Sequence, residues 1–241
     1  MLPADAAAPR VLTRRPGPSA CFAAIRKPEL YQNFAVHAFV MFPAAVVMCW
    51  IGTRADARFG LSPLPGVLAP LGLAMIAAGG VWVWYVYGYL YLAGGGSPGT
   101  HVDGGPTTMV DTGPYAMVRH PSVLGKLCGV IGLGLVFGSP IFTVGFTPIL
   151  VVYSLVTNRY LQEPFCDARF GARYAVYRTR VPMLLPQLAG IQRWLRDESA
   201  VPDDAPPTPA ASPHGIWMEL PGYLLGLGVL IGIFSLVAWV L

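Results

Sequence analysis

The sequence predicts an all-α, polytopic integral membrane protein with about five transmembrane helices. Of its 241 residues, 54% are hydrophobic and only 12% are charged, whereas a soluble domain carries roughly 25% charged residues. The apolar residues form long runs, and the arginines lie at the ends of those runs. A nucleic-acid-binding protein would instead gather its basic residues on one soluble face, so membrane orientation explains the net charge of +4 better.

Five apolar runs define the predicted spans. A membrane-spanning helix needs about 20 predominantly apolar residues, and four runs meet this requirement. A shorter run, which carries Lys126 near its start, is taken as the third span. The approximate bounds of the five are 33–51, 67–92, 124–137, 141–161 and 216–241.

The third and fourth runs are separated only by Gly138, Ser139 and Pro140. Glycine permits a chain reversal, and proline cannot continue the interior of a helix. The two runs are therefore predicted to form a tight helical hairpin within the membrane.

The distribution of arginine predicts the orientation of the chain. The N-terminal tail, residues 1–32, and the segment after the fourth span are both rich in arginine. We expect these segments, with the loop between the second and third spans, to be cytosolic. The C-terminus and the loop that contains Arg54 and Arg58 would lie on the opposite side. The abundance of arginine and alanine is typical of a GC-rich bacterial genome, which favours a bacterial inner membrane.

Two stretches have a composition typical of disorder, namely residues 1–20 and a linker at 197–215. The rest of the chain divides into the first two spans at 33–93, a catalytic region at 94–196 and a last helix at 216–241. The cysteines lack the spacing of a metal or redox site, so no metal is predicted and free, mostly buried thiols are expected at Cys21, Cys49, Cys128 and Cys166.

The polar and unusual residues of the cytosolic side form two blocks, 94–125 and 158–186. The predicted hairpin would bring these blocks together at one membrane face. The first block opens with a glycine run at 94–96, but no strand precedes it and no Lys-Ser/Thr pair follows, so a phosphate-binding loop is not indicated. We expect a flexible loop at 94–105, which could reach over the site as a lid.

Both blocks resemble one family of membrane enzymes. GPYAMVRHPSVLG, in the first block, resembles the G-x-Y-x-x-x-R-H-P-x-Y-x-G signature of isoprenylcysteine carboxyl methyltransferases and of related phospholipid and small-thiol methyltransferases. The second block resembles R-x-x-x-E-E-x-x-L-x-x-x-F-G-x-x-Y-x-x-Y-x-x-R-V-P of the same family. The resemblance covers residues 111–186, and it implies that S-adenosyl-L-methionine binds in a cytosolic pocket between the blocks.

The donor carries an ammonium, a carboxylate and an adenine, which require an acid, hydrogen-bond donors and aromatic walls. Glu163 is predicted to bind the ammonium or to orient a group that does; the alternative is an ion pair with a nearby arginine. His120 is predicted to be extended because it precedes Pro121, which suits the first turn of a helix. The imidazole and the free N–H groups of that helix would face the donor's carboxylate, unless the histidine only caps its own helix.

The resemblance implies further cofactor contacts, and some of these residues have another possible role. Arg119 is either a ligand or an anchor to lipid phosphate, and Tyr115 either lines the site or lies in an interfacial belt. Gly113 and Gly125 would permit close backbone approach. An amphipathic stretch after residue 171 would close the site or lie at the membrane surface. The remaining predicted cofactor contacts are Gln162, Tyr174, Tyr177 and Arg178.

The second block departs from the family pattern at two positions. Gln162 replaces the first acid of the pair, and Asn158 stands where the family has arginine. Arg159 follows one residue later and keeps the spacing to Glu163 that places two side chains on one helix face. We therefore predict Arg159 and Glu163 as catalytic residues, with Arg159 orienting an anionic acceptor. In the first block, Val123 replaces the tyrosine that the family signature has after His120 and Pro121.

The predicted activity is methyl transfer to a lipophilic acceptor delivered by the lipid bilayer, either a carboxylate, a thiol or a lipid amine. Such a step needs mainly positioning and exclusion of water. An NADPH-dependent membrane enone or sterol reductase on the same scaffold is the alternative enzyme, with Arg173, Arg178 and Arg180 for the 2′-phosphate. A non-enzymatic membrane scaffold or transporter is a second alternative, and it predicts no cofactor binding.

Overall fold

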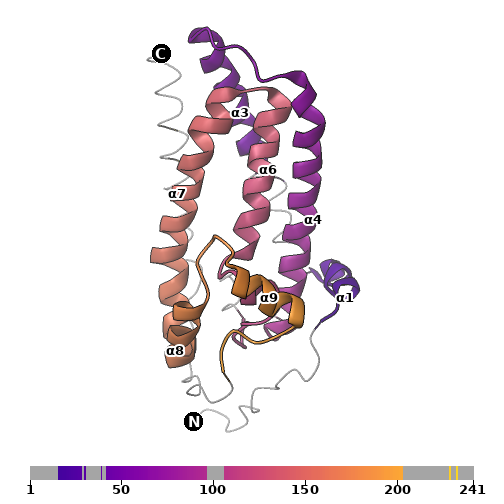
Figure 1. Cartoon of the computed structure of the whole chain (residues 1–241), viewed down its shortest axis with the longest axis vertical. Helices are drawn as coiled ribbons and strands as arrows, with labels where there is room; N and C mark the ends of the chain where they lie inside the picture. Colours follow the sequence, from indigo (N-terminus) through magenta and orange to yellow (C-terminus); the bar gives the residue numbers. More distant parts are fainter. Residues whose placement is uncertain are drawn as a thin grey trace.

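The computed structural model describes residues 16–28, 30, 39, 42–96, 106–202, 228 and 232, and these residues form helices and connecting turns without a strand. Long helices run along one axis of the molecule, and short helices gather at one end (Figure 1). The long elements are α3 (Phe42–Arg58), η3 with α4 (Gly66–Leu68 and Ala69–Ala93), α6 (Pro121–Phe137) and the continuous run η5, α7, η6 and α8 (Ile141–Phe146, Thr147–Thr157, Asn158–Gln162 and Glu163–Arg180). The short ones are α1 (Pro18–Ala23), η1 (Ala24–Arg26), α5 (Pro114–Met117) and α9 (Leu188–Arg196).

Helices α4 and α6 pack through small residues. A Cβ atom on Gly125 would lie 2.7 Å from the Gly79 carbonyl oxygen, and one on Gly72 would lie 2.6 Å from that of Gly132. Glycines at facing positions let two helix backbones approach closely, as in membrane helix pairs. These two pairs, seven residues apart on each helix, fix the register of the contact.

The predicted hairpin is confirmed. Helix α6 ends at Gly138, whose left-handed backbone (φ 67°) satisfies the last carbonyls of the helix. Pro140 precedes η5, and the chain then stays helical to Arg180 with a kink at Gly171. Segments η5 and η6 are π-helical, and such turns inside long helices are frequent at functional sites.

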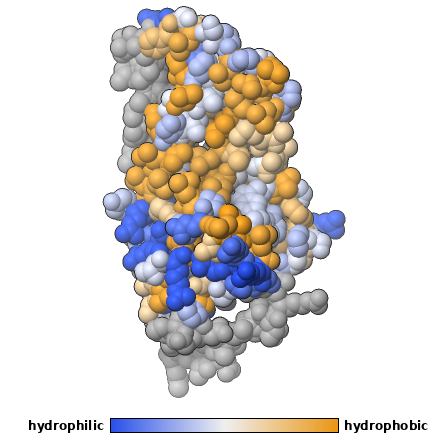
Figure 2. All heavy atoms as spheres, viewed as in Figure 1, coloured by the Kyte–Doolittle hydropathy of each residue, from blue (hydrophilic) through white to orange (hydrophobic). Residues whose placement is uncertain are grey.

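Within the described part of the chain, two helices are long and apolar enough to cross a membrane, Gly66–Ala93 and Ile141–Tyr160, and Pro121–Phe137 is apolar but shorter. Few residues of the two long helices are buried, and some apolar side chains are largely exposed, with Val67 at 80% and Val144 at 72% exposure. A core helix of a soluble protein would bury such side chains, so these surfaces suit lipid. Apolar residues cover the upper part of the molecule, and a hydrophilic band crosses its lower part over α8 and α9 (Figure 2).

The first predicted span needs a correction. Helix α3 continues to Arg58, whereas we expected the span to end at residue 51 and Arg54 and Arg58 to lie in a loop. The helix continues because Arg54 stacks over the Trp50 ring at 5.0 Å, and Asp56 is buried against the start of η5. Most of 33–41, and the fifth span at 216–241 apart from residues 228 and 232, lie outside the described residues.

The two segments predicted to be disordered also need correction where they are described. Residues 18–20 belong to α1, which packs on α4 so closely that a Cβ on Gly88 would overlap the Cys21 carbonyl. Burial raises the pKa of the Cys21 thiol to about 11. At the start of the predicted linker, Ala200 and Val201 are 2% and 1% exposed, because they join an apolar cluster with α8. Residues 1–15 and 203–215 lie outside the described part of the chain.

Candidate functional site

The two polar blocks meet at the lower end of the helices. The Arg119 amide donates to the Pro182 carbonyl at 2.9 Å, and the His120 amide donates to that of Met183 at 3.3 Å. The Tyr177 hydroxyl donates to the Tyr115 carbonyl at 2.8 Å. The two blocks, which the predicted hairpin was expected to bring together, are thus joined by direct hydrogen bonds.

The first block is shaped by a glycine and a proline. Gly113 has φ 57° and ψ −134°, and a Cβ there would collide with the Tyr89 ring. His120 has a non-helical backbone (φ −124°, ψ 66°), and Pro121 begins α6, as predicted. The imidazole makes no capping hydrogen bond to α6; its Nε2 atom lies 3.8 Å from Glu163 Oε1. The histidine thus faces the second block.

Glu163 is the centre of the site. Its side chain is 1% exposed and lies at the junction of η6 and α8. Arg119 Nη1 approaches Oε1 at 2.5 Å, and Arg159 Nη1 donates to Oε2 at 2.7 Å. The predicted pair at i and i+4 is confirmed, and Arg119 adds a second cation from the first block.

The environment determines the charge of these groups. Burial raises the pKa of Glu163, but the nearby His120 imidazole, the Arg159 hydrogen bond and the charge of Arg119 outweigh it, so the pKa lies below its ordinary value. Burial lowers the pKa of His120 despite the opposing carboxylate. At neutral pH the site therefore holds one carboxylate, two guanidinium groups and a neutral imidazole. It carries a surplus positive charge.

Four buried polar atoms of this cluster have no hydrogen-bond partner of acceptable geometry: Arg119 Nε and Nη1, His120 Nε2 and Glu163 Oε1. Arg119 Nη1 and Glu163 Oε1 are close enough for an ion pair, but their directions do not suit a hydrogen bond. Buried polar groups normally have such partners. The site therefore offers donors and an acceptor to a charged molecule.

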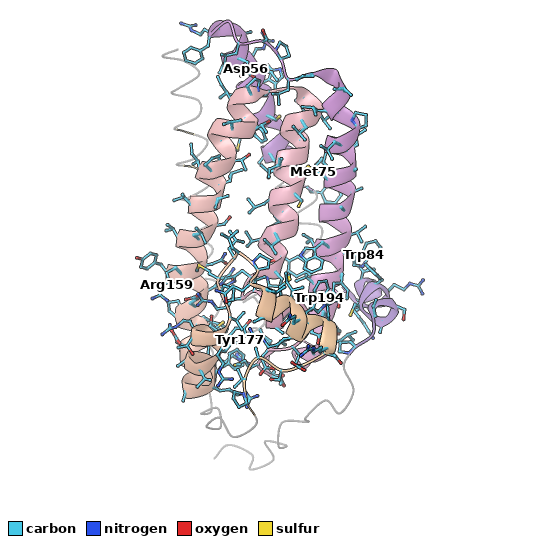
Figure 3. All side chains as sticks on the ribbon, in the orientation of Figure 1. Asp56, Met75, Trp84, Arg159, Tyr177 and Trp194 are labelled. Carbon is cyan, nitrogen blue, oxygen red and sulfur yellow. The ribbon has the colours of Figure 1, made fainter. Side chains whose placement is uncertain are left out.

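Aromatic residues pack beside this cluster. Tyr174 and Tyr177 are 4% and 3% exposed, and their ring centroids are 5.7 Å apart. Figure 3 shows Tyr177 at the lower end of the helices, with Arg159 at the outer side of the long helix. Burial, the largest effect in each case, raises the pKa values of Tyr115, Tyr174 and Tyr177, which therefore stay neutral.

Several predicted site residues have other neighbours. Gly125 faces α4, where helix packing accounts for it. Arg178 forms an ion pair with Asp167 at 2.6 Å. Gln162 is half-buried in η6, and the side chain of Arg159 is 53% exposed. The predicted cofactor contacts, these residues included, and the catalytic role of Arg159 stay predictions.

The sequence did not predict a clamp around Asp111. Its Oδ2 atom accepts hydrogen bonds from Arg173 at 3.3 Å and Ser199 at 2.8 Å, and its carbonyl accepts one from the Ala200 amide at 3.0 Å. The clamp joins the first block, α8 and the chain after α9. The only local signal is an acid two residues before the Gly113 turn, and the partners of Asp111 are distant in sequence.

The predicted glycine loop is described only in part. Gly94 ends α4, and its carbonyl accepts the amide of Thr107 at 2.9 Å. Gly95 and Gly96 have positive φ angles of 90° and 82°. The run is thus a helix end, and residues 97–105, the body of the proposed lid, lie outside the described residues.

Comparison with known proteins gives one match. Residues 68–173, from the start of α4 into α8, match a family model described as phospholipid methyltransferase. This segment contains the hairpin, Arg119, His120, Arg159 and Glu163. No curated protein and no solved structure matches the chain.

Proposed function

Because the chain belongs, through residues 68–173, to the phospholipid methyltransferase family of isoprenylcysteine carboxyl methyltransferase-like membrane methyltransferases, we propose that it uses S-adenosyl-L-methionine as methyl donor. We further propose a lipophilic acceptor that arrives from the bilayer and carries a carboxylate, thiol or lipid amine. The donor site would face the cytosol of a bacterial cell, as the arginine distribution suggests.

The observation that carries the proposal is the buried cluster around Glu163. The amino-acid end of the donor bears one ammonium and one carboxylate. Glu163 Oε1 would accept from the ammonium, and Arg119 Nε and His120 Nε2, which have no hydrogen-bond partner within the protein, would bind the carboxylate. The surplus positive charge of the cluster suits a carboxylate that the protein does not itself supply.

When bound, S-adenosylmethionine supplies an electrophilic methyl group. The chain's contribution is to orient the donor, exclude water and hold the acceptor in line. The buried tyrosines stay neutral, so they would serve as walls rather than as bases. The half-exposed guanidinium of Arg159, which already holds Glu163, is proposed to orient an anionic acceptor at the edge of the site.

The structure weakens the case for an NADPH-dependent reductase. Of the three arginines that could bind a 2′-phosphate, Arg173 is paired with Asp111 and Arg178 with Asp167. A phosphate would have to share these arginines with their acidic partners or displace those partners. The remaining alternative, a non-enzymatic scaffold or transporter, gives no reason for polar atoms buried without partners around Glu163.

Donor binding can be tested directly. We would purify the chain in detergent and measure S-adenosylmethionine and NADPH binding by calorimetry and by thermal stabilisation. We expect stabilisation by S-adenosylmethionine and at least a tenfold weaker affinity for it in Glu163→Ala. Asp167→Asn is the matched control, because Asp167 is also an α8 carboxylate paired with an arginine but lies 38% exposed. Undiminished binding in Glu163→Ala, or stabilisation by NADPH alone, would refute the proposal.

A further inference from the structure

Helix α9, Leu188–Arg196, presents an exposed apolar edge. Leu188 and Leu195 are 70% and 74% exposed, and Leu185, just before the helix, is 76% exposed. Residues seven apart lie on the same side of an α-helix, so the two helix leucines form one edge. Three large apolar side chains exposed together on a short segment indicate a surface that something apolar covers.

The opposite side of α9 is firmly attached to the protein. Gly190 packs on Met117, where a Cβ would lie 2.9 Å from the Met117 carbonyl oxygen. Trp194 packs edge-to-face on Trp82 with centroids 5.5 Å apart. The Trp82 indole in turn donates to the Pro121 carbonyl at 2.7 Å. The exposed edge is therefore held in a fixed position relative to the start of α6.

That position lies near one boundary of the membrane core. Helix α6 has 17 residues between Pro121 and the Gly138 turn, which at 1.5 Å per residue is about 25 Å. The hydrocarbon core is about 30 Å thick. The level of Pro121 and Trp82 is thus close to the edge of the hydrocarbon, and α9 lies across the long helices at this level (Figure 1).

From these observations we infer that α9 is a bilayer-docking helix, with Leu185, Leu188 and Leu195 inserted at the edge of the hydrocarbon. Arg196 is exposed on another side of the helix, where it can reach headgroups, whereas the Arg193 guanidinium donates to the Arg180 carbonyl at 3.2 Å. Asp197 and Glu198 follow directly and offset their charge. Docking therefore depends on the leucines, and it persists in zwitterionic lipid. The inference rests on the membrane location of the chain and not on its methyltransferase activity.

Docking of α9 to the bilayer would also fix the depth of the candidate donor site in the membrane. Helix α9 contacts Met117 directly and is linked to Pro121 through Trp82, and these two residues flank Arg119 and His120 in the sequence. A helix fixed to the membrane surface would hold this short segment at a constant depth. The donor site would then stay at the height at which a lipophilic acceptor can present its polar end.

Photo-crosslinking tests the contact. We would place p-benzoylphenylalanine at Leu188, Leu195 or Ala189 in the full chain and reconstitute it in phosphatidylcholine nanodiscs. Ala189 is the matched control, because it is exposed on the same helix but faces away from the leucine edge. After irradiation, mass spectrometry should find at least fivefold more lipid adduct from positions 188 and 195 than from 189. Equal labelling at all three positions, or adducts only to protein segments or to a second copy of the chain, would overturn the proposal.

A second measurement guards against misfolding caused by the bulky probe. Nitroxide labels on Leu195→Cys and Ala189→Cys would be exposed to oxygen, which concentrates in lipid, and to a water-soluble nickel chelate. We expect the ratio of oxygen accessibility to chelate accessibility to be at least threefold higher at position 195 than at position 189. The same preference at both positions would also overturn the inference. Failure of S-adenosylmethionine binding would leave both readouts unchanged, so the two proposals fail separately.

Discussion

Two buried carboxylates lie at different levels of the helical segment that begins at Ile141 and continues through α8. Asp56 is 5% exposed and meets the start of this segment, and Glu163 is 1% exposed and lies within it. Figure 3 shows Asp56 at the upper end of the molecule and Arg159, the partner of Glu163, near the lower end. Burial is thus similar at the two acids, and only their partners differ.

Asp56 binds backbone, whereas Glu163 binds side chains. Asp56 Oδ1 accepts the Ile141 amide at 3.0 Å, which satisfies a free N–H at the start of the long helix. Glu163 contacts two guanidinium groups and an imidazole, whose own donor atoms are only partly used. The comparison teaches that a buried acid alone does not mark a ligand site. Unsatisfied cationic partners around it do.

The largest expected effect is from Glu163→Gln. The amide keeps the shape of the carboxylate but leaves Arg119 and Arg159 without a counter-charge. Removing one partner of a buried ion pair typically costs about 3 kcal/mol or more, and donor binding should fall at least tenfold. Thermal unfolding in detergent and calorimetry would measure the two effects. Asp56→Asn can still accept from the Ile141 amide, so its free energy of unfolding should fall by less than about 1 kcal/mol. Equal losses of stability in the two variants would contradict the proposed difference between the two acids.

The next largest effect is expected from the packing of α4 against α6, which lies between the levels of Asp56 and Glu163. Gly125→Ala would place a Cβ 2.7 Å from the Gly79 carbonyl oxygen, which forces α4 and α6 apart at an expected cost of about 1–3 kcal/mol. Gly129→Ala on the same helix meets nothing within 4 Å and should be neutral or gain up to about 1 kcal/mol. Unfolding midpoints of the two variants in the same detergent would test this. A loss in Gly129→Ala as large as that in Gly125→Ala would contradict helix packing as the role of Gly125.

A smaller effect is expected from Asp56→Ala. The variant loses the cap on Ile141, and lost caps cost about 1 kcal/mol. Because Asp56 is distant from the site, S-adenosylmethionine affinity should stay within about twofold of wild type, as expected for a ΔΔG well below 1 kcal/mol. Calorimetry and thermal unfolding of one preparation give both numbers. A tenfold loss of S-adenosylmethionine affinity in Asp56→Ala would show that Asp56 affects the donor site, and the two acids would then not have separate roles.

The sequence was sufficient for the features that depend on local pattern. The Gly138-Pro140 turn, the apolar runs of α4 and α7, and the start of α6 at Pro121 each follow from a few neighbouring residues. His120 is non-helical but not extended, since its ψ is 66°. The pair of Arg159 and Glu163 follows from helix periodicity. These predictions needed no knowledge of how distant segments pack.

Features that depend on long-range packing could not be predicted. Arg119 reaches Glu163 only because the hairpin returns the second block to the first. The chain at 197–202 reads as disordered from its Asp, Ser and Pro content, yet Ala200 and Val201 are buried through the bonds of Ser199 and Ala200 to Asp111. Helix α9 has only nine residues and is stabilised by contacts of Gly190 and Trp194 with distant elements. Local composition contains none of this information.

The smallest expected effect is the dependence of stability on pH. The pKa of His120 is lowered in the folded chain, so as pH falls through about 6.5 the unfolded chain takes up a proton that the folded chain does not, and stability decreases. The pKa of Glu163 is also lowered, so its stabilisation is present above about 4.5 and is lost as pH falls further. Both groups therefore destabilise the fold in acid, in successive windows. Unfolding midpoints measured from pH 7.5 to 4 should fall for wild type, and His120→Gln should remove the upper part of the decline. If the pH profile of His120→Gln is the same as that of wild type, His120 is not the group that titrates near pH 6.5. Asp56→Ala is the control. It should keep the decline near pH 6.5, because Asp56 is at the other end of the molecule from His120.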